Sequence, residues 1–190
     1  SQSDHLIVVS RTPTNGVHVV DGANGNYLYT LKMSSPTVTI TGGTLPINMA
    51  GVDDDGVIYV CNLTTDGNTT PFKVYRWFDD NAAAEPELVW SGNPVAGTSQ
   101  RWGDSFAVRG SSSDPQLLVA TRSSNIVSIL RPGFTSTDAT AYYTDGSAGN
   151  YGLSVAFGLG DVFWGKANGQ SLREVSFSPD TGASATVHNN

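Results

Sequence analysis

The stretch "DSFAVRGSSSDPQLLVATRSSNIVSIL" (residues 104–130) contains three short apolar runs separated by two polar segments. The runs extend over residues 106–108, 117–120 and 126–130. None shows the sustained 3.6-residue periodicity of a helix, and Gly, Ser, Asp and Pro fill the segments between them. The stretch therefore predicts three consecutive β-strands joined by tight turns.

The middle run, "LLVATR" (117–122), has relatives elsewhere in the chain: "LIVVSR" (6–11), "VIYVCN" (57–62) and "VFWGK" (162–166). When the four runs are aligned, equivalent apolar residues lie 51, 60 and 44 residues apart, at Ile7, Ile58, Leu118 and Val162. A four-stranded propeller blade occupies roughly 40–50 residues, with loop insertions lengthening some copies. The intervals therefore predict four tandem units of this kind.

The segments around these runs repeat as well. Small residues mark the strand expected before each of the last three runs, at 47–52, 104–109 and 153–158, as expected for strands that crowd around a common centre. A third strand follows each run at 16–21, 71–77, 125–130 and 171–177, and a weaker fourth at 26–31, 87–92, 140–145 and 183–188. We expect one all-β, propeller-like domain over residues 1–190, with blades of about four antiparallel strands at approximately 1–40, 41–95, 96–146 and 147–190.

The first unit differs from the others because "HLIVVS" opens it, and nothing before this run can serve as an innermost strand. Two arrangements fit this pattern. The four blades close into a small ring, or the chain is an open half of a larger propeller whose free strand edges pair with another chain. The sequence contains one cysteine, so no intramolecular disulfide can fasten a small ring. We therefore favour the open half-ring.

Three segments resemble a family of secreted bacterial propeller-like proteins with no assigned activity. They are "TPFKVYRW" (70–77), "RWGDSFAVRG" (101–110) and "GLSVAFGLGDVFWGKANGQSLREVSF" (152–177). The resemblance covers nearly all of the chain, which is similar to the first half of the family's domain. It implies export and display outside the cell or at its surface. It implies no catalytic residues.

Composition excludes several classes of function. The net charge is −7, with only 10 Lys and Arg, so the chain lacks the basic surface that a general nucleic-acid binder needs to neutralise phosphates. No apolar stretch approaches the ~20 residues that span a bilayer. We expect neither a nucleic-acid partner nor a membrane span.

A candidate binding face follows from the alignment of the second strands. Equivalent polar residues stand at the ends of these strands: Arg11, Asn62, Arg122 and Lys166. Cations gathered on one face of an acidic protein can bind a carboxylate or sulfate group. The alternative is structural, with these side chains bonded to loop carbonyls and to acids of the neighbouring blade, such as Asp104 or Asp53.

Two further residues complete the set of candidate site residues. Trp102 begins a Gly-containing loop, where an indole ring can stack on a sugar, although a tryptophan there can equally belong to the core. Asp104 lies two residues further on and can form a carboxylate pair for glycoside hydrolysis with Asp53 in a central channel, although no motif singles these two residues out.

No catalytic, metal or cofactor site is predicted. The three histidines have no metal-ligand partner at close spacing, and no G-x-S-x-G nucleophile elbow occurs. "DDDG" (53–56) lacks the remaining ligands of an EF-hand and predicts a hairpin turn.

We therefore expect a non-catalytic extracellular module for binding or scaffolding, whose partner is a carbohydrate or a surface protein. Two alternatives stay open. One is a polysaccharide-acting hydrolase or lyase that uses Asp104. The other is a structural repeat unit that self-assembles, or pairs with a missing half-propeller, through open blade edges.

Overall fold

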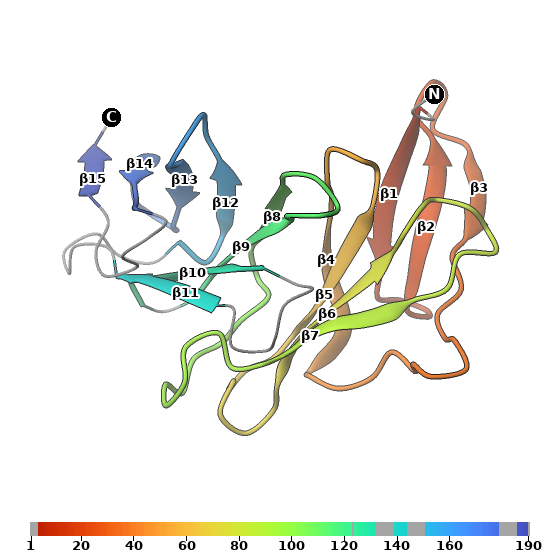
Figure 1. Cartoon of the computed structure of the whole chain (residues 1–190), viewed down its shortest axis with the longest axis horizontal. Coiled ribbons are helices and arrows are strands. Elements are labelled where there is room, and N and C mark those ends of the chain that lie inside the picture. The colour runs from red at the N-terminus through yellow and green to blue at the C-terminus, as the bar shows by residue number, and fades with distance from the viewer. Residues whose placement is uncertain (1–3, 123, 132–138, 144–150, 179–185, 190) are drawn as a thin grey trace.

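A computed structural model describes residues 4–122, 124–131, 139–143, 151–178 and 186–189 of the chain. In these residues four antiparallel sheets follow one another in chain order (Figure 1). Sheet 1 contains β1 (His5–Ser10), β2 (Gly16–Asp21) and β3 (Tyr27–Thr30). Sheet 2 contains β4 (Leu45–Val52), β5 (Ile58–Leu63), β6 (Phe72–Trp77) and β7 (Glu87–Gly92).

Sheet 3 contains β8 (Phe106–Arg109), β9 (Gln116–Ala120), β10 (Ile126–Leu130) and β11 (Ala139–Tyr143). Sheet 4 contains β12 (Ser154–Phe157), β13 (Val162–Lys166), β14 (Arg173–Ser176) and β15 (Thr186–Asn189). Each strand pairs with its neighbours along the chain, so every sheet is a simple meander. The described residues contain no helix, which confirms the prediction of an all-β protein.

The apolar runs form strands buried on both faces because they lie between two neighbouring sheets. All six residues of β5 are buried. Side chains alternate between the two faces of a strand, so Ile58 and Val60 pack toward sheet 1 while Tyr59 and Cys61 pack toward sheet 3. This double burial explains why the run is continuously apolar and does not alternate with polar residues.

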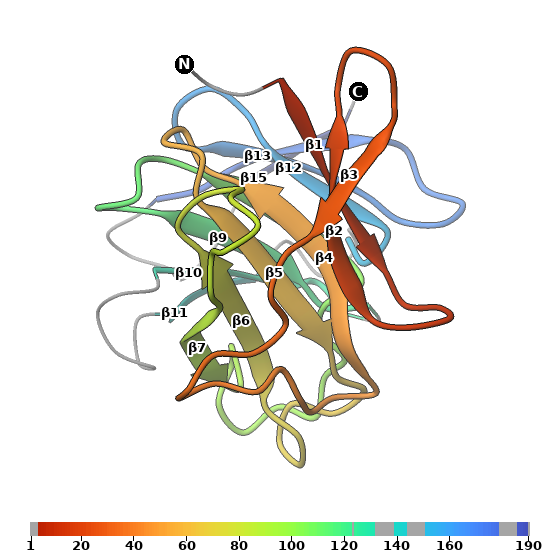
Figure 2. The same ribbon diagram turned by 90° about the vertical axis from the view of Figure 1, so that its right-hand side faces the viewer.

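Three apolar layers join the four sheets. The layer between sheets 1 and 2 includes Val17, Leu31 and Trp77, and the layer between sheets 2 and 3 includes Phe72, Trp90, Trp102 and Leu117. The layer between sheets 3 and 4 includes Leu118, Val127, Tyr151 and Phe163. Seen from the end of the molecule, sheet 1 lies across sheet 2 (Figure 2). Core packing is therefore distributed along the whole row of sheets.

The leading strands of sheets 2, 3 and 4 contact one another, β4 against β8 and β8 against β12. Small residues permit this approach, as expected from the sequence. A Cβ atom added to Gly51 on β4 would lie 2.5 Å from a methyl carbon of Val108 on β8. A larger residue at position 51 would therefore push these two strands apart.

The segment 53–56 forms a turn between β4 and β5, as its Asp-Gly sequence predicts. The Asp53 carboxylate is buried and accepts hydrogen bonds from the Val57 amide at 2.9 Å and the Tyr59 hydroxyl at 3.3 Å. Burial, together with the nearby Asp53 charge, raises the pKa of Tyr59 to about 12. Gly56 has φ +90°, a left-handed conformation that favours glycine.

Candidate functional site

The four polar residues that the alignment singled out lie at the ends of equivalent strands. Asn62 and Lys166 are in the final two positions of β5 and β13, while Arg11 comes directly after β1 and Arg122 lies two residues beyond the end of β9. Arg11 and Arg122 are exposed, Lys166 is half-buried and Asn62 is fully buried. The four residues therefore differ in what they offer to a ligand.

Asn62 has a structural role. Its side-chain oxygen accepts a hydrogen bond from the Lys73 amide at 2.9 Å, and its side-chain nitrogen donates to the Pro71 carbonyl at 3.2 Å. The amide thus satisfies backbone groups at the start of β6, and its side chain is shielded from solvent. The prediction that Asn62 binds a ligand is therefore corrected: its side chain instead holds the β5–β6 connection in place.

The prediction that Trp102 binds a ligand is also corrected, because its side chain is fully buried in the layer between sheets 2 and 3. Its backbone exchanges two hydrogen bonds with Thr64, both at 3.0 Å, so the loop that carries it is tied to the end of β5. An indole with no exposed surface cannot stack on a sugar ring. The core alternative for this tryptophan is the one the structure favours.

Asp104 lies at the centre of a charged cluster just before β8. Arg101 binds its carboxylate with two hydrogen bonds, from Nε to Oδ2 at 2.5 Å and from Nη2 to Oδ1 at 2.7 Å. Arg122 adds a third, from Nη1 to Oδ1 at 3.3 Å. The hydrogen bond with Asp104 raises the pKa of Arg101 above its ordinary value.

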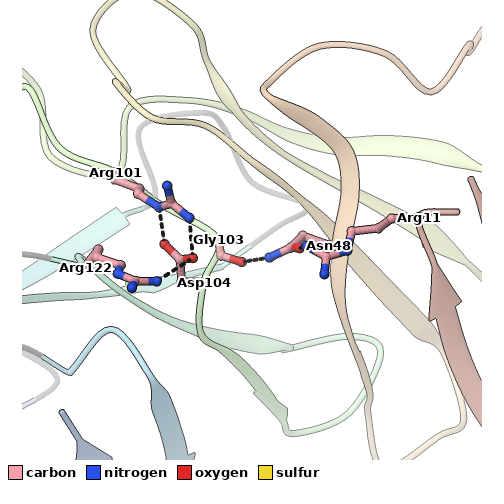
Figure 3. A network of polar contacts seen from close by, with 6 residues as sticks. All are labelled: Arg11, Asn48, Arg101, Gly103, Asp104 and Arg122. Carbon is pink, nitrogen blue, oxygen red and sulfur yellow. Dashed lines mark hydrogen bonds and ion pairs between the residues drawn. The ribbon is translucent and has the colours of Figure 1, made fainter. Parts of the chain in front are cut away.

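Arg11 joins this cluster through Asn48 on β4 (Figure 3). The Asn48 side-chain nitrogen donates to the Gly103 carbonyl at 2.6 Å, and its oxygen accepts from Arg11 Nη1 at 3.0 Å. We call the six residues drawn in Figure 3 the arginine network: Arg11, Asn48, Arg101, Gly103, Asp104 and Arg122. It connects residues of sheets 1, 2 and 3.

Gly103 explains how Asp104 is positioned. Its φ is +98°, and a Cβ atom there would approach the Asn62 carbonyl oxygen to 2.1 Å. Only glycine fits both constraints. The chain therefore passes close against β5 and then delivers Asp104 between the two guanidinium groups.

The arginine network contains three guanidinium groups and one carboxylate, so it is net cationic although the chain as a whole carries −7. It lies at the surface, because the side chains of Arg122 and Arg101 are 47% and 36% exposed. Such an arrangement can accept an anionic group with oxygen atoms placed for bidentate hydrogen bonds. Lys166 lies on sheet 4, outside the network.

Sequence reasoning missed Arg101 and Asn48 as members of the site. Arg101 could have been predicted, since in "RWGD" this cation stands three residues before Asp104 and is close enough in sequence to bind its carboxylate. Asn48 had none, because its partner Gly103 is 55 residues away. Arg122 bonds to Asp104 as the structural alternative proposed, although both residues flank strands of sheet 3.

In the part of the chain that the structure describes, no group of three or more His, Cys, Asp or Glu residues is arranged to hold a metal ion. No helix among those residues is long and apolar enough to cross a membrane.

The fold and the cluster define an all-β protein of four consecutive antiparallel sheets with a cationic site at one end of the strands. Residues 2–151 match the family described as "Domain of unknown function (DUF4623)". The chain therefore belongs to this family, in agreement with the resemblance to a family with no assigned activity.

Solved structures with a similar fold include the following two. One is the crystal structure of a DUF4623 family protein from Bacteroides eggerthii DSM 20697, with 18% identity and a TM-score of 0.67. It matches 94% of this chain, which spans 42% of the length of that protein. The other is the complex of KlAtg21 with the coiled-coil of AgAtg16, with 12% identity, a TM-score of 0.52 and coverage of 96% of this chain and 52% of that one. At such identities the similarity concerns the fold alone. No curated protein matches the sequence.

Proposed function

We propose that the chain is a non-catalytic, extracellular β-propeller module that binds an anionic carbohydrate, with carboxylate or sulfate groups, at the arginine network. The observation that carries this proposal is the excess of guanidinium groups over carboxylates in the network. Arg11 and Arg122 are exposed, and within the described part of the chain each makes one side-chain hydrogen bond, at 3.0 and 3.3 Å. Each guanidinium therefore keeps donors that can bind a ligand.

The propeller architecture is supported by the contacts of the leading strand β8 with both β4 and β12 and by the apolar layers between successive sheets. In such an arrangement the strand ends around the centre form a shared face on which ligands meet several sheets at once. The arginine network occupies a face of this kind, since it connects sheets 1, 2 and 3. An acidic surface of another protein presents the same carboxylate chemistry.

An array of sulfated, uronate-containing and neutral glycans tests the proposal. We expect binding to the anionic glycans and a loss of about tenfold in affinity for each of Arg11→Gln and Arg122→Gln, the effect of one charge-assisted contact. Lys32→Gln is the matched control, because Lys32 is an exposed cation outside the network. Its Nζ atom pairs with Glu85 Oε1 at 2.7 Å. Equal binding of neutral and anionic glycans would contradict the proposal.

The enzymatic alternative, a polysaccharide hydrolase or lyase that uses Asp104, has less support. Both oxygens of Asp104 already accept hydrogen bonds from guanidinium groups. Asp53 lies by the start of β5, while the network meets its other end at Asn62. Val57, which donates a hydrogen bond to Asp53, and Asn62 are five residues apart, a separation of roughly 16 Å at ~3.3 Å per residue, beyond the carboxylate pairs of glycosidases. New reducing ends or unsaturated uronates released from anionic polysaccharides would revive the alternative.

The structural alternative is assembly through open blade edges, and β1 is an edge strand of sheet 1. Leu6 and Val8 on β1 are 55% and 45% exposed, so the outer face of this sheet presents apolar side chains. A single species of 20.0 kDa in a solution mass measurement would argue against assembly by this chain. If larger species occur, the double variant Leu6→Lys, Val8→Lys should dissociate them.

A further inference from the structure

A groove of about 560 Å³ lies between sheets 1 and 2, at the end of β5 opposite the arginine network. We call it the acidic groove, and its lining residues are His5, Ile7, Val52, Asp53, Asp55, Gly56, Ile58, Phe78, Asp79 and Asp80. They come from β1, from the end of β4 through the first residue of β5, and from the segment after β6. The volume falls within the range of small-ligand sites, roughly 300–1,000 Å³.

Part of the groove wall is apolar and accessible to solvent. Phe78 is 53% exposed and Val52 is 43% exposed, and Ile7 lies beside them on β1. The walls of the groove therefore offer an aromatic ring and aliphatic side chains to an occupant. This apolar wall distinguishes the groove from an ordinary solvated acidic surface, which offers charges alone.

The charges of the groove have nearly one sign, with four carboxylates and one imidazole. Asp80 Oδ2 contacts His5 Nδ1 at 2.6 Å, and Asp79 Oδ1 accepts the Asn81 amide at 2.8 Å. Hydrogen bonds from Ser112 keep the pKa of Asp55 below its ordinary value. Each carboxylate oxygen can accept more than one hydrogen bond, so the exposed carboxylates of Asp55 and Asp79 keep acceptor capacity for a cation.

One guanidinium already rests against the groove's aromatic ring. The Arg76 Cζ atom lies 4.3 Å from the centroid of Phe78, and the same guanidinium donates two hydrogen bonds to Glu87, at 3.1 and 3.0 Å. The protein thus holds a guanidinium between this ring and a carboxylate. The groove offers the same two partners, a Phe78 ring and several carboxylates, to a group from outside.

We propose that the acidic groove binds an arginine side chain of a partner peptide. Charge complementarity selects a cation, and the exposed Phe78 ring with adjacent carboxylates favours the planar guanidinium, which stacks and forms bidentate hydrogen bonds, over an ammonium group. The site is separate from the anion site proposed above, because the two lie at opposite ends of β5.

The test is a titration of the isotope-labelled chain with capped Ala-Arg-Ala, Ala-Lys-Ala and Ala-Glu-Ala peptides, followed by chemical-shift changes. We expect the arginine peptide to shift groove resonances with a Kd on the order of millimolar, as suits one side chain. The lysine peptide should bind several-fold more weakly and the glutamate peptide should cause no shift. Raising the salt concentration should weaken binding.

Asp79→Asn is the decisive variant, because its amide oxygen can still accept the Asn81 hydrogen bond while the charge is lost. We expect a loss of about fivefold in affinity or more, the effect of one charge-assisted partner. Glu85→Gln is the matched control, an exposed acid outside the groove whose replacement should change nothing. Phe78→Leu should remove the preference for arginine over lysine while thermal unfolding stays near that of the wild type.

Three outcomes would overturn the proposal. The first is that the shifts map to the arginine network or scatter over the surface. The second is that Asp79→Asn and Glu85→Gln bind the arginine peptide equally. The third is that groove resonances shift with protein concentration in the absence of peptide and stop doing so in Arg122→Gln, which would assign the groove to a second copy of the chain.

Discussion

The two ends of β5 carry charge in different ways. In the arginine network, groups of opposite sign bond to one another, and a glycine with φ +98° sets their position. In the acidic groove, carboxylates gather beside an exposed aromatic ring with one imidazole among them. The first end is a structural network with more guanidinium groups than carboxylates, and the second is an open groove whose charged groups are nearly all negative. Prearranged geometry and net charge are therefore separate properties of a surface.

The largest effect is expected where the network rests on the core. Trp102→Ala removes a fully buried indole beneath the cationic end, and we expect a loss of ~3–5 kcal/mol in the free energy of unfolding. Urea denaturation measures it. Trp164→Ala, at a half-buried tryptophan on β13, is the matched control and should cost less. Equal costs would mean that Trp102 is no better packed than Trp164.

Cys61 lies in β5 between the two ends and can report on both. It is fully buried, and this burial raises the pKa of its thiol to about 12, so reaction with a thiol reagent at pH 8 requires the protein to open. We expect labelling of the native chain to be slower than labelling in urea by several orders of magnitude. Variants that loosen either end should accelerate it, whereas an equal rate in native and unfolded protein would place Cys61 at the surface.

Asp104→Asn separates stability from ligand binding at the network. It takes a charged partner from Arg101 and Arg122, and we expect a loss of about 1–3 kcal/mol in unfolding free energy. The same change should strengthen binding of an anionic glycan, because the guanidinium groups gain net positive charge. Asp114→Asn, whose 3.6 Å pair with Arg131 is exposed, is the control and should change stability by ~0–1 kcal/mol. Weaker glycan binding by Asp104→Asn would count against the proposed site.

The smallest effect is expected at the rim of the groove. Asp55 accepts hydrogen bonds from the Ser112 amide at 2.8 Å and its hydroxyl at 2.9 Å, which lower the pKa of the carboxyl. A lowered folded-state pKa stabilises the protein above the unfolded value near 3.8, and this contribution disappears as the pH falls through the folded value. Ser112→Ala should raise the pKa of Asp55 part of the way back, as measured by carboxyl chemical shifts. An unchanged pKa would show that the backbone bond alone sets it.

The sequence predicts the strands well because each is an apolar run between turn residues. The expected run 57–62 became Ile58–Leu63, and 104–109 became Phe106–Arg109. The last expected strand, 183–188, overlaps Thr186–Asn189, and its first three residues lie outside the described part of the chain. Repetition made these assignments firm, since a pattern present in four copies is tested four times.

The candidate sites could be predicted only in part. Strand equivalence located Arg11 and Arg122, but it could not reveal that Asn62 bonds to the backbone of Lys73 and Pro71. The acidic groove was missed although "DDDG" was correctly interpreted as a turn. Its charge density arises because that turn meets Asp80 and His5 from other parts of the chain. Such meetings depend on how sheets pack, which local sequence does not encode.

The row of three apolar layers has a consequence for local opening. Among the described residues, sheets 2 and 3 are each packed on both faces, whereas sheets 1 and 4 each share a single layer with a neighbour. Backbone amides of β2 and β14 should therefore exchange with deuterium sooner than those of β5 and β10, through sub-global openings that leave the middle of the row intact. His5 belongs to sheet 1, so the acidic groove would lose one wall in such an opening while the Arg101–Asp104 pair stayed closed.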